Sequence, residues 1–249
     1  MLLVDRDSIP KETVDEINRL KPKKVYLIGE TSSIGNEVLE ALNKNFNISY
    51  ENIIRIGGKD REETSLLIGE KMKELTDIEN IYVVNGYRGE SDAMSILSKA
   101  CNEKSPILIT NGNKLNDGQI DFLSNIYYPN FYFIGGEHVI KDSLYDEVGN
   151  LFDVELSRLR VYGRNNQDTN GEVLDYFYGE NVGSLIVTKS DNLIDALCVG
   201  AFAGKGDIPV VMATDGLSEV QRSVIKNKSY DTLIEVGGGI SSRVINELK

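Results

Sequence analysis

Histidine and cysteine are scarce in this chain. Its 249 residues include one histidine, two cysteines and no tryptophan. Because zinc sites draw most of their ligands from histidine and cysteine, we expect no metal site. Cys101 and Cys198 each lie in an apolar, helix-like run, where we expect a buried thiol that packs as a small hydrophobic group. A disulfide is the alternative.

Long hydrophobic runs and an excess of positive charge are also lacking. No apolar run approaches the about 20 residues of a membrane-spanning helix, so we expect no membrane partner. The net charge is -12, which argues against a nucleic-acid partner because such proteins carry a basic surface. The first residues are too few and too acidic for a signal peptide, so we expect any export signal to lie outside this sequence.

Sequence motifs of catalysis and nucleotide binding are absent. The sequence has no G-x-S-x-G, no H-E-x-x-H and no phosphate-binding G-K-[S/T]. The glycine turns in "GETSSI" and "GGEHVI" lack the second and third glycines of a dinucleotide fingerprint. We therefore expect no catalytic activity and no cofactor. An enzyme that uses a nucleotide or a sugar phosphate on a Rossmann-like fold is the alternative.

One stretch of the sequence occurs three times. It reads "VYLIGETSSIGNEVLEAL" at 25–42, "FYFIGGEHVIKDSLYDEV" at 131–148 and "LIEVGGGISSRVINELK" at 233–249. In each copy an apolar strand ends at a glycine, and apolar residues then recur every four positions, as on one face of a helix. Three such units predict a repeated domain.

Other landmarks recur with nearly the same period. "RIGGKDREET" at 55–64 matches "RVYGRNNQDT" at 160–169, "SDAMSI" at 91–96 matches "IDALCV" at 194–199, and "PILIT" at 106–110 matches "PVVMAT" at 209–214. The chain is therefore predicted to hold two full copies, 50–154 and 155–249, after the last part of a first copy at 1–49. The shortened first copy is expected to leave a strand edge open to pairing.

Within each copy, apolar strands alternate with helical segments. The strands are nearly continuous apolar runs, which is typical of a parallel sheet with helices on both faces. We therefore predict an α/β fold of tandem small doubly wound, Rossmann-like domains.

Four ordered stretches carry a family likeness. "RIGGKDREETSLLI", "SDAMSI", "PILIT" and "FYFIGGEHVIKDSL" together resemble the type 2 cell-wall-binding repeat of clostridial cell-wall and surface-layer proteins, and the resemblance covers the whole chain. It implies three tandem repeats in a pseudo-threefold arrangement, the first one truncated here. It also implies a noncatalytic module, secreted to the cell wall or surface layer, that anchors a surface protein to an anionic, teichoic-acid-like polymer. Other repeats or surface-layer chains are further implied partners.

The resemblance also implies the site residues. The family's arginine motif falls on Arg55, Gly58, Arg61 and Thr64, and then on Arg160, Gly163 and Thr169, where Asn166 replaces the second arginine and Arg164 lies near enough to substitute for it. Arginine suits such a polymer because its guanidinium group clamps a phosphate with two parallel hydrogen bonds. With Lys59 beside the first motif and the two Asp-Ala pairs, the predicted polymer-binding residues are Arg55, Lys59, Arg61, Thr64, Asp92, Arg160, Arg164, Thr169 and Asp195.

Two alternatives stay open for these residues. The arginines could pair with the chain's own carboxylates where copies meet, and so hold domains together. Asp92 and Asp195 lie at expected helix starts, where capping would explain them. The whole module could also be a structural array element without a ligand of its own.

Overall fold

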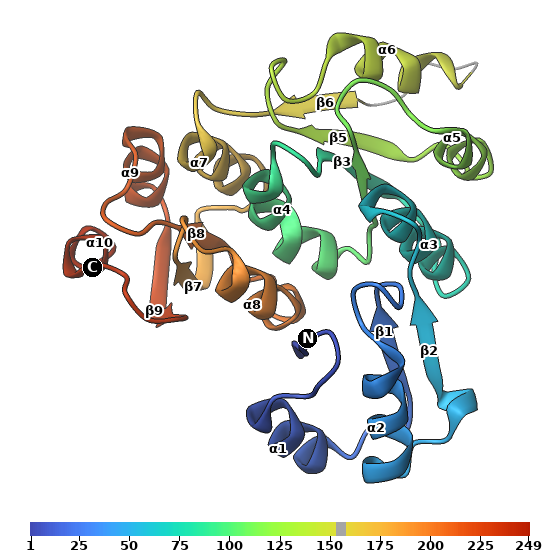
Figure 1. Cartoon of the computed structure of the whole chain (residues 1–249). Helices are drawn as coiled ribbons and strands as arrows, with labels where there is room; N and C mark the ends of the chain where they lie inside the picture. The colour runs from blue at the N-terminus through green and yellow to red at the C-terminus, as the bar shows by residue number, and fades with distance from the viewer. Residues whose placement is uncertain (153–157) are drawn as a thin grey trace. The chain divides into compact units, whose positions relative to one another are not determined.

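The computed structural model of the protein describes residues 1–152 and 158–249. It contains two compact units, Met1–Ile68 and Gly69–Lys249. The described strands form three sheets, all with parallel pairing (Figure 1). The first sheet has the strand order β1-β2, the second β4-β3-β5-β6 and the third β8-β7-β9. The predicted α/β class with parallel sheets in repeated units is confirmed.

The strands are short and mostly apolar. Their bounds are β1 Val25–Ile28, β2 Ile53–Ile56, β3 Asn80–Asn85, β4 Ile107–Thr110, β5 Asn130–Ile134, β6 Arg158–Val161, β7 Asn181–Thr188, β8 Val210–Met212 and β9 Ser229–Glu235. In β3 every residue after Asn80 is buried. A strand covered by helices on both faces loses water on both sides, so its sequence is continuously apolar instead of alternating.

Helices connect the strands. Their bounds are α1 Lys11–Leu20, α2 Asn36–Phe46, α3 Arg61–Lys73, α4 Glu90–Asn102, α5 Asp117–Ser124, α6 Asp142–Asn150, α7 Asn166–Phe177, α8 Ile194–Lys205, α9 Glu219–Lys226 and α10 Ser242–Glu247, with a short 3-10 turn at Tyr50–Asn52. Capping boxes begin α5 and α9, where Asn116 pairs with Gln119 and Ser218 with Gln221. No described helix has the length and hydropathy required to cross a membrane.

The strand that opens each full sequence copy pairs with the sheet that precedes it in the chain. β2 pairs with β1, which sets Arg55 opposite Leu27, and β6 pairs with β5, which sets Arg160 opposite Phe133. The sheets are therefore offset by one strand from the sequence copies 50–154 and 155–249. The expected boundary between residues 154 and 155 lies outside the described residues, and the division into these copies stays a prediction.

In the first unit, α1 and α2 pack on the two-stranded first sheet. Its core comprises Ile17, Leu27, Val38, Leu42, Ile48 and Ile53. Among the described strands β1 pairs with β2 alone.

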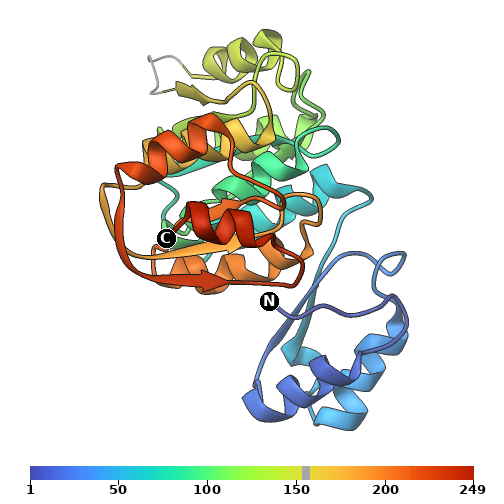
Figure 2. The ribbon, with the colours of Figure 1, turned by 90° about the vertical axis from the view of Figure 1, so that its left-hand side faces the viewer.

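In the second unit, helices α4, α7 and α8 lie between the second and third sheets (Figure 1). On the face of the third sheet away from α8, α9 and α10 bury Val224, Ile225, Val244 and Ile245 against β7 and β8, and Leu174 of α7 joins the same cluster (Figure 2). The α4–α8 contact is close because Gly204 of α8 faces Cys101 of α4.

The two cysteines lie on helices, as expected, but one burial prediction was wrong. Cys101 and Cys198 are both free thiols. Cys198 is half-buried, whereas Cys101, the last residue but one of α4, is exposed although its Cβ faces Gly204 of α8.

Candidate functional site

The first arginine of each motif is bound by the protein itself. Arg55 projects from β2, and its Nη1 donates hydrogen bonds of 2.8 Å to both the Gly29 and the Ile34 carbonyl oxygens. These carbonyls belong to the glycine turn between β1 and α2. Its Nη2 is buried and has no hydrogen-bond partner among the described residues. Arg55 thus ties the strand of one copy to the glycine turn of the copy before.

Arg160 repeats this arrangement in the second sheet. Its Nη1 donates to the Ile140 carbonyl oxygen at 2.6 Å, and its Nη2 forms a 2.8 Å ion pair with Asp142 at the start of α6. The guanidinium carbon lies 5.4 Å from the centre of the Tyr145 ring. The carboxylate that Arg160 uses is replaced by Asn36 in the first unit. Arg160 thus pairs with a carboxylate of the chain itself, as in the alternative drawn from the sequence, whereas Arg55 binds carbonyl oxygens only.

The glycine and threonine of the motif form a small turn ahead of the next helix. The Gly58 N–H donates to the Thr64 hydroxyl at 3.0 Å, and the Gly163 N–H donates to the Thr169 hydroxyl at 3.1 Å. The Thr64 hydroxyl in turn donates to the Asp60 carbonyl at 2.8 Å. The recurrence of the same contact accounts for the glycine-to-threonine spacing by turn geometry, without reference to a ligand.

The other basic residues of the motifs lie at the surface. Lys59 and Arg61 are exposed just before and at the start of α3. The Arg164 side chain is 80% exposed, and its Nε lies 3.4 Å from the carboxylate of Asp168, which is buried. These three cations are on the surface, where an anion can reach them.

The two aspartates of the Asp-Ala pairs face the glycine turns of their own sheets. Asp92 of α4 is 2% exposed and lies so close to Gly135 that a Cβ there would approach its carboxylate to 3.1 Å. Gly135 has φ 131°, a conformation that favours glycine. Burial raises the pKa of Asp92 to about 7. Asp195 lies against Gly237 in a similar way, but it is only half-buried.

A polar pocket that the sequence did not reveal lies at the carboxyl ends of β7 and β8. Its volume is about 440 Å³, and its lining residues are Gln167, Ser190, Asp191, Thr214, Asp215, Gly216, Leu217, Arg222 and Arg243. We refer to it as the third-sheet pocket. Ligands of open parallel α/β sheets bind outside the carboxyl ends of the strands, so its position suits binding.

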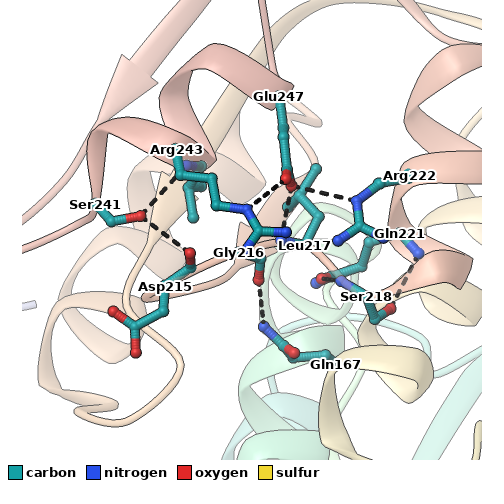
Figure 3. Close-up of polar contacts among 11 residues, drawn as sticks. Gln167, Asp215, Gly216, Leu217, Ser218, Gln221, Arg222, Ser241, Arg243 and Glu247 are labelled. Atoms are coloured by element: carbon teal, nitrogen blue, oxygen red, sulfur yellow. Dashed lines mark hydrogen bonds and ion pairs between the residues drawn. The ribbon is translucent and has the colours of Figure 1, made fainter.

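Two arginines converge on one carboxylate at this pocket (Figure 3). The Nε of Arg222 lies 3.3 Å from Glu247, and the Nε of Arg243 lies 2.9 Å from the other oxygen of the same carboxylate. The Leu217 N–H also donates to Glu247 at 3.0 Å. This backbone hydrogen bond, followed by the one from Arg243, holds the pKa of Glu247 below its ordinary value.

This geometry leaves donors for a ligand. Arg222 and Arg243 are 42% and 67% exposed, and each uses its Nε for Glu247. The terminal nitrogens of two neighbouring guanidinium groups can bind the oxygens of a phosphate. Hydroxyl and carboxylate groups of Ser190, Thr214 and Asp215 line the same pocket and suit the hydroxyl groups of a sugar.

The second sheet has an equivalent pocket with different charge. It measures about 470 Å³ and is lined by Asn113, Lys114, Ser143, Asp146, Glu147, Asn150 and Leu151. The Leu115 N–H donates to Glu147 at 2.8 Å, as Leu217 does to Glu247. The positions of Arg222 and Arg243 are taken by Ile120 and Ser143. Glu147 of α6 and Glu247 of α10 recur at equivalent positions, and this recurrence is a sequence signal that could have pointed to the site.

The comparison with protein families bears on this repeated geometry. The model of cell wall binding domain 2 (CWB2) matches residues 55–145 and 160–245. The chain belongs to this family. Each match begins at the arginine that docks into the preceding glycine turn, and the family likeness drawn from the sequence is thereby confirmed. The matched domain is a cell wall binding domain, which agrees with the expected noncatalytic role.

Solved structures and curated proteins agree with this membership. Cwp6 from Clostridium difficile superposes with a TM-score of 0.92 at 32% identity over 98% of this chain and 38% of that one. Cwp8 from the same organism gives 0.86 at 29% identity, over 98% and 41%.

Two curated proteins of Bacillus subtilis (strain 168) are also similar. N-acetylmuramoyl-L-alanine amidase LytC is 25% identical over 81% of this chain and 40% of its own length, and the amidase enhancer is 24% identical over 100% and 33%. The chain spans less than half the length of each of these proteins.

Proposed function

We propose that this chain anchors a surface protein to the bacterial cell wall by noncovalent binding of an anionic, teichoic-acid-like polymer, outside the cell at the wall or surface layer. Support comes from the CWB2 family match and from the cell wall proteins whose structures it resembles. The observation that carries the polymer proposal is the paired Arg222 and Arg243 in the third-sheet pocket.

Charge decides where such a polymer can bind. The net charge of -12 repels a polyanion at long range, so contacts require places where cations cluster. The third-sheet pocket supplies two arginines, and Lys59, Arg61 and Arg164 supply exposed cations near the starts of α3 and α7. Single exposed pairs contribute only about 0.2–1 kcal/mol. Anchoring therefore requires several weak contacts to a repetitive ligand, which multivalency combines.

The motif residues divide into two groups under this proposal. Arg55 and Arg160 donate hydrogen bonds to carbonyl oxygens of the glycine turns. We propose that these two residues hold consecutive copies together. Thr64 and Thr169 support the turns ahead of α3 and α7, and Asp92 and Asp195 lie against the glycine turns after β5 and β9. Polymer contact is left to the exposed cations.

The test is co-sedimentation with purified cell walls. Arg222→Ala/Arg243→Ala should lower the bound fraction, because it removes both guanidinium groups while Glu247 keeps its bond from Leu217. The matched control is Lys205→Ala/Lys226→Ala, which removes the same charge from exposed positions on α8 and α9. Thermal melting of both variants checks the fold. Equal wall binding by the two double variants would refute the pocket as a polymer site.

A further inference from the structure

Two tyrosines on the loop between α5 and β5 project into solvent. Tyr127 is 88% exposed and Tyr128 is 49% exposed. Their rings contact each other edge to face, with centroids 4.6 Å apart and planes at 66°. A singly exposed aromatic residue needs no explanation, but a contacting pair presents a joint apolar surface to water.

The loop is held in place on both sides of this pair. Ile126 before it and Pro129 after it are buried. The Ile126 N–H donates to the Leu123 carbonyl oxygen at 3.1 Å, and the Asn130 N–H donates to the Glu79 carbonyl oxygen at 2.8 Å. Rings carried by a turn that is fixed in this way lose little conformational freedom when a ligand binds, as in a preorganised site.

Tyr128 has an unusual backbone conformation. Its φ is 40°, in a region that bulky residues rarely adopt. The other described non-glycine residues with positive φ lie within two positions of a helix end, where this conformation is ordinary; they are Lys21, Asn47, Lys104 and Asp207. Tyr128 lies four residues past the end of α5. Strained backbone positions of this kind cluster at ligand sites.

The third sheet is built without this pair. Counted back from the glycine turn at the end of each strand, Ser229 takes the place of Tyr127 and Tyr230 that of Tyr128. The Tyr230 hydroxyl donates to the Leu248 carbonyl oxygen, so this tyrosine serves the fold. Because the same kind of sheet forms with serine at the first position, the fold does not require an exposed ring at Tyr127.

The chemistry of the loop indicates an uncharged ligand. Residues 125–130, NIYYPN, carry no charged side chain. A tyrosine ring offers its face to the C–H groups of a pyranose, and its hydroxyl group bonds to the hydroxyl groups of the sugar. Asn125 is exposed two positions before Tyr127, and its Nδ2 donates to the Asp121 carbonyl oxygen at 2.8 Å. This bond fixes the amide, whose oxygen is an acceptor for a sugar hydroxyl.

We propose that Tyr127 and Tyr128 form a stacking site for a neutral pyranose of the cell-wall glycan. Such a contact rests on the proposed function, which brings the chain to the wall. It adds binding that charge does not govern, on a loop at the amino end of β5, whereas the third-sheet pocket lies at the carboxyl ends of its strands. One stacking contact is weak, so it contributes to anchoring together with the cationic contacts and does not retain the chain on stripped peptidoglycan by itself.

Two neutral probes test the site. One is the oligosaccharide fraction released from the wall polymer by hydrofluoric acid, which cleaves phosphodiesters, and the other is a disaccharide of N-acetylglucosamine, which represents the neutral sugar of peptidoglycan. Titration of the isotope-labelled whole chain, followed by NMR, should give saturable shifts at the amides of Ile126, Tyr127, Tyr128 and Asn130 with at least one probe. The probe that binds more tightly identifies the source of the sugar.

Variants separate stacking from a structural role. Tyr127→Ala should weaken binding of the probe by at least about tenfold, whereas Tyr127→Phe keeps the ring and should change it by less than about threefold. Tyr50→Ala is the matched control, because Tyr50 is 52% exposed on the other compact unit, and it should leave binding unchanged. Thermal melting should be the same for Tyr127→Ala and the parent protein, because the side chain is almost fully exposed.

Salt dependence separates this site from the cationic contacts. Binding of the neutral probe should be equal at about 0.1 M and about 1 M salt, because no charge pair is screened. No saturable shift with either probe, or shifts that Tyr127→Ala leaves unchanged, would overturn the stacking site, while wall binding that depends on Arg222 and Arg243 would still support the proposed function. A dimer in sedimentation velocity that Tyr127→Ala dissociates would show that a second copy covers the pair, and would also overturn it.

Discussion

Arginine at position 160 is a structural residue by its contacts. Its guanidinium group bridges β6 to the glycine turn and to α6 through Ile140 and Asp142. Arg164, four residues later, is largely exposed. The sequence showed that both lie in one motif, but it could not separate them. Whether an arginine is held by the protein or exposed depends on which turn the fold brings next to its guanidinium group. The residue type alone does not show which turn that is.

Replacing these two arginines should therefore have different effects. Arg160→Ala should lower the free energy of unfolding by about 2–3 kcal/mol, because a charge-assisted hydrogen bond is lost and a carbonyl is left without its donor. Arg164→Ala should change it by less than about 0.5 kcal/mol. Urea denaturation of the two variants checks this. Equal losses would show that Arg160 does not hold the turn.

The missing carboxylate beside Arg55 offers a second prediction. Asn36 occupies the position that Asp142 holds beside Arg160, and the buried Nη2 of Arg55 lacks a partner among the described residues. Asn36→Asp should stabilise the protein by about 0.5–1 kcal/mol, by pairing with Arg55 and by placing a negative charge at the start of α2. Asp142→Asn is the reverse control and should destabilise it. A shift of the melting temperature in the same direction for both would contradict the assignment.

Asp92 should make stability depend on pH. Burial raises its pKa to about 7 from an ordinary value of 3.8. Between these values the unfolded chain has lost the proton that the folded chain keeps, so stability falls by about 1.4 kcal/mol per pH unit as the pH rises. The stabilisation that comes from keeping Asp92 protonated in the fold is fully present below pH 3.8 and is lost above about pH 7.

Asp92→Asn should remove this dependence. The stability of the variant relative to the parent protein should rise by roughly 2–4 kcal/mol between about pH 4.5 and 7.5, as measured by denaturation at each pH. Parallel curves for the two proteins would show that Asp92 is already ionised in the folded state, and would contradict the role given to its burial.

At the scale of elements, helix contacts depend on glycines that the sequence pattern does not explain. Gly204 lies in the last turn of α8, where alanine is ordinarily better by about 1 kcal/mol. A Cβ at this position would lie 2.3 Å from the Cβ of Cys101 on α4. Gly204→Ala should therefore destabilise the protein by about 1–3 kcal/mol, because α4 and α8 must separate. Gly179→Ala, which meets open space, is the control. A more stable Gly204→Ala variant would contradict close packing of the two helices.

The strands illustrate how far the sequence could predict the elements. Alternating apolar runs and helical periodicity were sufficient for the parallel α/β class, and repeated landmarks gave the copies. They could not predict that β2 and β6 join the preceding sheets. An apolar strand such as Ile53–Ile56 fits any covered edge equally well, and the choice is made by Arg55 reaching the Gly29 and Ile34 carbonyls.

At the scale of the whole molecule, an acidic chain with locally clustered cations is the central feature. The CWB2 match places the chain in a family of cell wall binding domains. The third-sheet pocket could not be predicted from the sequence, because Arg222 and Arg243 lie 21 residues apart, on separate helices that meet only in the fold. Their shared partner Glu247 holds both near one place.

The most direct test of this account is binding of the chain to purified cell walls before and after chemical removal of their anionic polymer. We expect the chain to co-sediment with intact walls and to remain in solution with stripped peptidoglycan. Re-addition of the released polymer as a soluble competitor should displace it from intact walls. Equal binding to intact and stripped walls, without competition by the polymer, would contradict the proposal that an anionic polymer is the ligand.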